Sequence, residues 1–174
     1  MTAAAQILLD RIKSDGSIDG QVIKVDKFLN HMVDPKLMRV LAKEIAGRFA
    51  DKMIDKILTA ETSGIMLAQA VAEELDVSFI YAKKKKPLTM TEYYAAASYS
   101  FTKQESTTLY VSREVLSAGD RLLFIDDFYA KGSTLKAIDE IVAQSQTVLV
   151  GSAVIINKGE RQDVESILTL ADLQ

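Results

Sequence analysis

The sequence predicts an α/β fold with a mainly parallel central sheet flanked by helices. Short apolar runs typical of strands alternate along the chain with stretches whose apolar residues recur at helical spacing. The run from Val148 to Ile156 is apolar almost throughout, which is typical of a strand buried on both faces. No internal repeat or Pro/Gly linker divides the 174 residues, so residues 1–174 are interpreted as a single domain.

The first third of the chain is expected to hold two helices with a short strand between them. Residues 3–13 place apolar side chains on one side of a helix. The turn-rich stretch DGSIDG follows, and residues 22–26 then alternate as in a short strand. Asp34 before Pro35 is typical of a helix start, and apolar residues recur at helical spacing from there to about Asp51.

Three strand-like runs follow in the middle of the chain, at residues 56–60, 77–81 and 121–125. The first leads through ETSG into a helix over residues 65–75. The second leads into four consecutive lysines, and the third into the loop DDFYAKGST and another helix. Residues 93–101 and 107–111 alternate and are rich in Tyr, Thr and Ser, so they are expected to form an antiparallel ribbon beside the main sheet.

Composition and charge exclude several classes of function. Lys and Arg total 21 against 24 Asp and Glu, so the net charge of −3 leaves no global basic field for nucleic acid. The chain has no Cys and one His, which excludes disulfides, thiolate catalysis and His-rich metal sites. The N-terminal stretch lacks the basic leader of a signal peptide, and no long apolar run suggests a membrane span. We therefore expect a cytoplasmic protein with neither a membrane nor a nucleic-acid partner.

Two strand ends carry small-residue loops followed by helices, at residues 61–64 and 130–134. Ligands of open α/β sheets bind at the carboxyl ends of the strands. Gly lets backbone N–H groups converge there, and Ser or Thr adds hydroxyl donors at a helix N-terminus, which together bind an anion. Turn and cap residues have the same composition, and for residues 61–64 alone that structural explanation is the stronger one.

The loop at residues 130–134 differs because Asp126 and Asp127 precede it. Two adjacent carboxylates would repel a bare phosphate, so the ligand must also offer hydroxyl groups, a divalent cation or a developing positive charge. A ribose 5-phosphate has this pattern, with a phosphate at one end and a diol at the other. A Walker A loop is excluded because the order here is K-G-S rather than G-K-S, and no G-x-G-x-x-G dinucleotide fingerprint occurs.

The stretch LLFIDDFYAKGST resembles the phosphoribosyl-pyrophosphate (PRPP) signature of the type I phosphoribosyltransferases. Within that family the chain is most similar to the bacterial xanthine phosphoribosyltransferases, through the segments KVDKFLNHMVDP, ETSGI, YAKKKKPLT, SYSFTKQ and VIINK. The resemblance implies the type I phosphoribosyltransferase-like fold, with a small hood formed by about residues 1–35 and the C-terminal end. It also implies a mobile flap ribbon at about residues 88–100.

The resemblance also implies roles for individual residues. Asp126 and Asp127 would be the catalytic pair that faces the ribose, and Ile23, Asn30 and Lys158 would bind xanthine. PRPP would be held by Ala130, Lys131, Gly132, Ser133, Thr134, Thr62, Ser63, Gly64 and Lys84. Two positions depart from the family's pattern: Lys131 stands where Thr or Asn is common, and Asn157 where an acid is more usual.

The activity that the resemblance implies is transfer of the 5-phosphoribosyl group from PRPP to N9 of xanthine in purine salvage. The products would be xanthosine 5′-monophosphate (XMP) and pyrophosphate, Mg²⁺ would enter held mainly by PRPP, and the enzyme would be a homodimer. Two alternatives stay open: another purine base (guanine, hypoxanthine or adenine), or a non-catalytic regulator that senses PRPP. The residues before Val22 are too few for the winged helix that a DNA-binding regulator would need.

Several of the singled-out residues also have a structural explanation. The lysine run at residues 83–86 has the composition of a solvated loop, although its place after a strand favours pyrophosphate binding. His31 alone titrates near neutrality, yet packing in the hood explains it better than catalysis does. Tyr93, Tyr94 and Tyr99 are better explained by ribbon packing or a subunit contact than by stacking on a base.

Overall fold

Five parallel strands form the central sheet of the computed structural model, which describes residues 1–20, 22–100 and 105–173. Their order across the sheet is β4-β3-β7-β8-β9, and every neighbouring pair is parallel. Their bounds are Lys56–Ala60 for β3, Ser78–Ala82 for β4, Arg121–Tyr129 for β7, Val148–Asn157 for β8 and Glu165–Thr169 for β9. The predicted α/β fold with a mainly parallel sheet is confirmed.

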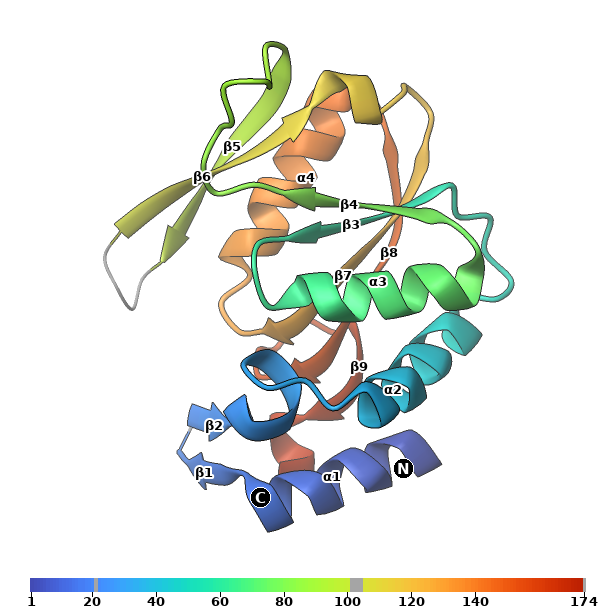
Figure 1. Cartoon of the computed structure of the whole chain (residues 1–174), viewed down its shortest axis with the longest axis vertical. Helices are drawn as coiled ribbons and strands as arrows, with labels where there is room; N and C mark the ends of the chain where they lie inside the picture. Colours follow the sequence, from blue (N-terminus) through green and yellow to red (C-terminus); the bar gives the residue numbers. More distant parts are fainter. Residues whose placement is uncertain (21, 101–104, 174) are drawn as a thin grey trace.

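Helices cover both faces of this sheet (Figure 1). On one face lie α2 (Pro35–Arg48) and α3 (Gly64–Leu75), and on the other lies α4 (Ser133–Ser145). Alternate residues of β7 follow this division, because Ile125 is buried with α2 and α3 whereas Phe124 is buried with α4. A strand covered on both faces needs apolar residues throughout, which explains the continuous apolar runs. None of the described helices is long and apolar enough to cross a membrane.

The N-terminal elements pack against the β9 edge of the sheet, near both chain ends (Figure 1). They are α1 (Ala3–Asp15), β1 (Ser17–Asp19), β2 (Val22–Lys24) and a short π-helix, η1 (Asp26–Asn30). The short C-terminal helix η3 (Leu170–Leu173) follows β9. The turn-rich stretch DGSIDG contains one strand that the sequence does not predict, β1, whose backbone pairs antiparallel with β2.

The start of α2 lies where the sequence predicts it. Asp34 Oδ1 accepts hydrogen bonds from the backbone N–H groups of Lys36, at 2.9 Å, and Leu37, at 3.2 Å. Pro35 occupies the first turn, where it needs no hydrogen-bond donor. This arrangement confirms the predicted helix start.

β9 has no counterpart in the sequence prediction. Its five residues carry little periodicity of their own, and the strand forms by pairing in parallel with the edge of β8, from Ala153↔Glu165 to Asn157↔Thr169. Such a strand depends on a distant partner rather than on its own pattern.

An antiparallel ribbon projects beside the sheet, as predicted, and is made of β5 (Tyr93–Ser100) and β6 (Glu105–Ser112) (Figure 1). Gln144 of α4 fixes the base of the ribbon, since its side-chain amide donates to Ala95 O at 2.8 Å and accepts from Ala95 N–H at 3.3 Å. A single turn of helix, η2 (Arg113–Val115), follows β6. Phe101, the end of the first predicted ribbon strand, lies outside the described residues.

The predicted strand at residues 121–125 is longer in the structure. β7 continues to Tyr129 and pairs with β8 up to Tyr129↔Asn157. Asp126 and Asp127 therefore lie in the strand and not in the loop that their polarity suggests. β8 offers a continuous backbone partner along this length, and that pairing outweighs the low strand propensity of Asp.

Candidate active site

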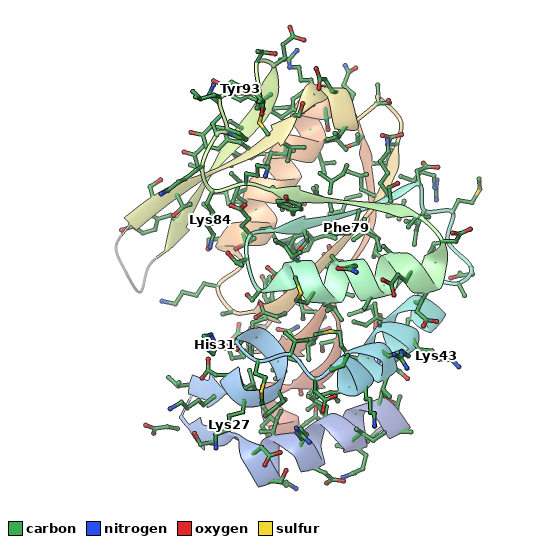
Figure 2. All side chains as sticks on the ribbon, viewed as in Figure 1. Lys27, His31, Lys43, Phe79, Lys84 and Tyr93 are labelled. Atoms are coloured by element: carbon green, nitrogen blue, oxygen red, sulfur yellow. The ribbon has the colours of Figure 1, made fainter. Side chains whose placement is uncertain are left out.

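The carboxyl ends of the central strands open on a cavity of about 350 Å³. Its walls come from the loop after β3, the residue pair Asp126 and Asp127 near the end of β7, and the first turn of α4. The ribbon adds Ser98 and Thr107. Lys84, at the end of β4, also lines the cavity, and Figure 2 shows it in the region between the ribbon above and the N-terminal elements below. This is the edge at which ligands of open α/β sheets bind.

The two carboxylates are held by the backbone that follows each of them. Asp127 N–H donates to Asp126 Oδ1 at 2.9 Å, and Phe128 N–H donates to Asp127 Oδ1 at 2.9 Å. Burial raises the pKa of Asp126 well above its ordinary value of 3.8, and the neighbouring Asp127 charge raises it further, while Lys84 opposes both. A ligand that brings hydroxyl donors or positive charge would relieve this repulsion.

Gly64 gives α3 a close approach to Asp126. A Cβ at this position would lie 2.6 Å from Asp126 Oδ1 and 3.3 Å from Asp126 Cα, so only Gly fits without a shift of the strand or the helix. Thr62 and Ser63 line the cavity, whereas Gly64 lies behind them against β7. The structure thus places two of the three predicted pyrophosphate-loop residues on the cavity wall and gives the third a packing role.

The predicted phosphate loop connects β7 to α4. Gly132 has φ +74° and directly precedes the helix, and Ser133 and Thr134 form its first turn. All five predicted residues line a second cavity of about 120 Å³ that shares residues with the first. The N-terminus of the 13-residue helix α4 therefore faces a small space lined by hydroxyl groups and by Lys131, which suits an anion.

The Tyr129 side chain packs against this loop, a role that the sequence analysis does not predict. A Cβ at Gly132 would lie 2.5 Å from Tyr129 Oη, and a Cβ at Gly159 would lie 2.6 Å from Tyr129 Cε1. The ring therefore packs between two glycines from different loops. The available signal was an aromatic residue inside the motif FYAKG, next to a Gly that needs a positive φ.

Two neighbouring lysines of the run at residues 83–86 have different surroundings: Lys83 contacts the ribbon, and Lys84 lines the cavity. Lys83 exchanges two backbone hydrogen bonds with Tyr110, at 2.8 and 2.9 Å, and its ammonium lies 4.5 Å from the centroid of the Tyr81 ring. Lys84 lines the cavity, and its backbone N–H donates to Glu61 Oε2 at 2.7 Å. Among the described residues, the run contributes only Lys84 to the cavity wall. Glu61 was not singled out from the sequence.

Lys158 lies beside the cavity, and the other two predicted base-binding residues do not line it. The Lys158 ammonium is 5.0 Å from the centroid of the Phe128 ring, which belongs to the walls of both cavities. Ile23 is buried in the apolar cluster. Asn30 has a buried side-chain oxygen without a hydrogen-bond partner among the described residues. His31 is exposed on the N-terminal elements (Figure 2).

Asn157 shapes the turn that carries Lys158. Its Nδ2 donates to Arg161 O at 3.0 Å, and its Oδ1 accepts from Gly159 N–H at 2.9 Å. A carboxylate has no donor for the Arg161 carbonyl, so the amide at this position fits the local hydrogen bonding better than an acid would.

Comparisons with known proteins agree with this geometry. A family model described as the phosphoribosyl transferase domain matches residues 25–170. The chain belongs to the phosphoribosyltransferase family. The resemblance found in the sequence is therefore confirmed, and the matched range includes β3, β4, β7 and α4, which build the cavity of this phosphoribosyltransferase.

Curated relatives of this phosphoribosyltransferase include two bacterial xanthine phosphoribosyltransferases. The one from Heliobacterium modesticaldum is 45% identical over 154 residues, covering 88% of this chain and 82% of the relative. The one from Levilactobacillus brevis is 46% identical over 155 residues, covering 88% and 81%.

Solved structures show the same fold. The adenine phosphoribosyltransferase from Rhodothermus marinus has a TM-score of 0.74 at 22% identity, covering 97% of this chain and 100% of that one. The adenine phosphoribosyltransferase from Trypanosoma brucei has a TM-score of 0.77 at 18% identity, covering 99% and 82%. At these identities the likeness concerns the fold alone, and it confirms the predicted phosphoribosyltransferase-like architecture.

Proposed function

We propose that this phosphoribosyltransferase transfers the 5-phosphoribosyl group from PRPP to N9 of xanthine, giving XMP and pyrophosphate. The observation that carries the proposal is a cavity with a carboxylate pair, a helix N-terminus and a lysine around it, in a chain 45% identical to a xanthine phosphoribosyltransferase. In the reaction the bond from the anomeric carbon to pyrophosphate breaks, the bond to N9 forms, and the base loses one proton.

The residues around the cavity would each meet one part of PRPP. The phosphate loop, residues 130–134, would hold the 5-phosphate and so fix the sugar for reaction. Asp126 and Asp127 would face the ribose, where positive charge develops as the bond breaks. Thr62, Ser63 and Lys84 would face the departing pyrophosphate, which gains negative charge.

A magnesium ion fits this arrangement. Asp126 and Asp127 line the cavity, and carboxylate oxygens are among the hard donors that Mg²⁺ prefers. In the described parts of the chain, no cluster of three His, Asp or Glu side chains is arranged as a metal site of its own. We propose that the ion enters on PRPP, is held mainly by substrate oxygens and water, and neutralises charge on the pyrophosphate.

The base would bind between the phosphoribosyl site and the N-terminal elements. We propose that residues 1–174 form one domain, in which about residues 1–35 and the C-terminal end are the hood over the base. Lys158 beside Phe128 would contact xanthine, together with Ile23 and Asn30 of the hood. Residues 88–100, which include cavity-lining Ser98, would be the flap that excludes water from the activated sugar.

A panel of purine bases tests the proposal. Xanthine, guanine, hypoxanthine and adenine are each supplied with PRPP and Mg²⁺, and nucleotide formation is followed. The proposal expects the highest kcat/KM with xanthine. A higher value with another base would change the substrate, and tight PRPP binding without turnover of any base would replace the enzyme by a PRPP-sensing regulator.

We further propose, from family membership alone, that the enzyme is a homodimer and acts in the cytoplasm. Sedimentation analysis of the purified protein tests the dimer, and a species of one chain's mass at micromolar concentration would contradict it.

A further inference from the structure

Glu61 connects two loops at the end of the cavity that would receive pyrophosphate. It is the first residue after β3, whose pairing with β4 ends at Ala60↔Ala82. Its backbone N–H donates to Ala82 O at 3.0 Å, and its side-chain Oε2 accepts from Lys84 N–H at 2.7 Å. In a continued parallel pair, Lys84 N–H would donate to a backbone carbonyl of the β3 segment. Here it donates to the Glu61 carboxylate instead, so the hydrogen bonding between the two segments continues by one bond past the ends of the strands.

The charge of Glu61 is unfavourable in this position. Its carboxylate lines the same cavity as Asp126 and Asp127, and a third negative charge there repels an incoming polyphosphate. What the position requires is a long side chain, because Glu61 must reach from the end of β3 to the backbone of Lys84. Because Glu61 accepts a hydrogen bond from the backbone N–H of Lys84, the Cα of Lys84 is held in place on the cavity wall that Thr62 and Ser63 also line.

We propose that Glu61 is a positioning residue for the pyrophosphate end of PRPP, acting through the reach of its side chain and not through its charge. By holding Lys84 N–H it aligns the loop after β3 with the loop after β4, so that Lys84 and the hydroxyls of Thr62 and Ser63 meet the same group. The inference rests on the proposed function. It adds to that function the residue that joins the two halves of the pyrophosphate site.

Two substitutions of Glu61 distinguish an effect of side-chain length from an effect of negative charge. Glu61→Gln keeps an acceptor at the same distance and removes the charge, whereas Glu61→Asp keeps the charge and shortens the side chain by one methylene. Isothermal titration measures the affinity of each variant for Mg-pyrophosphate, for PRPP with Mg²⁺, and for XMP. We expect Glu61→Asp to weaken the first two by about 10-fold, since the shorter side chain loses the hydrogen bond from Lys84 N–H and the two loops are no longer aligned. Glu61→Gln is expected to stay within about threefold of the parent, or to bind pyrophosphate more tightly.

XMP serves as the internal control because it lacks pyrophosphate, so its affinity is expected to be unchanged in both variants. Glu74→Gln and Glu74→Asp, at the far end of α3 from the cavity, are the matched controls for a changed acid elsewhere. Weak binding by Glu61→Gln with normal binding by Glu61→Asp would overturn the inference, because the charge would then be the active feature. Equal effects of both variants, or no effect of either, would also overturn it. A parent protein that binds neither PRPP nor XMP would instead refute the proposed function.

Discussion

The proposed phosphoribosyl side and the proposed base side of this molecule are built in different ways. On the phosphoribosyl side, Asp126 to Thr134 are consecutive in the chain, and one strand-to-helix connection places them around two adjoining cavities. On the proposed base side, Ile23, Asn30 and Lys158 come from distant segments: Ile23 from β2, Asn30 from the end of η1, and Lys158 from the turn after β8. Under the proposed function, the comparison teaches that one local segment would supply recognition of the sugar phosphate, whereas base recognition would depend on how the N-terminal elements pack on the sheet.

The largest effect is expected from Gly132→Val in the phosphate loop. A β-branched residue is strained at φ +74°, and its Cβ would collide with Tyr129, so the loop cannot keep its shape. We expect loss of PRPP affinity by more than about 100-fold in a protein that stays folded. Titration calorimetry measures the affinity. Gly119→Val is the matched control, since Gly119 has φ +87° in open space. Near-normal PRPP binding by Gly132→Val would remove this loop from the site.

Asp126→Asn and Asp127→Asn test whether the carboxylates act on the transition state. Each change keeps the size of the side chain and removes its charge. If the charge stabilises the cationic sugar, kcat is expected to fall by roughly 10- to 1000-fold, more than PRPP affinity falls. Steady-state kinetics and direct binding supply the two numbers. Loss of affinity with kcat intact would mean that the pair only holds the ribose.

Lys158→Ala tests the base side. Removing the ammonium beside Phe128 is expected to raise KM for the base by about 10-fold, through one lost charged contact, with KM for PRPP within twofold. Lys86→Ala is the matched control, because the Lys86 ammonium lies 5.1 Å from the centroid of the Tyr93 ring, on the ribbon. If KM for PRPP rises and that for the base does not, Lys158 belongs to the phosphoribosyl side.

The smallest effect is expected in stability. A carboxyl whose pKa is raised on folding binds its proton more tightly in the folded state, so its contribution to stability falls as pH rises from 3.8 toward the raised value. The ligand-free protein is therefore less stable at pH 7 than it would be if this carboxyl had its ordinary pKa. Asp126→Asn is expected to raise Tm by a few degrees at pH 7 and by less near pH 4. Exposed Asp51→Asn is expected to leave Tm unchanged. A lower Tm for Asp126→Asn at pH 7 would contradict this account.

The strand, loop and helix of the proposed phosphoribosyl side are predicted well from the sequence because their signals are local. The consecutive acids, the Gly with positive φ and the helix start occur within nine residues, and apolar periodicity places the strand before them. The prediction ends β7 too early, since Asp126 and Asp127 join the strand through pairing with β8. Strand propensity describes single residues, so it cannot predict this pairing with a distant strand.

Other features could not be predicted because they depend on contacts between distant segments. β9 exists through its pairing with β8, and the packing of Tyr129 between Gly132 and Gly159 joins two loops. The hydrogen bond from Lys84 N–H to Glu61 likewise crosses between two strand ends. For the same reason, the base-binding roles of Ile23 and Asn30 stay predictions that rest on resemblance.

The most direct test of the division between the two sides is PRPP binding in the absence of base, measured by titration calorimetry on the parent and on Asn30→Ala. The account predicts equal PRPP affinity for both proteins, within twofold, while kcat/KM for xanthine falls by at least about fivefold in the variant, as expected for a lost polar contact. A parallel loss of PRPP affinity in Asn30→Ala would contradict it, because the hood would then belong to the phosphoribosyl site.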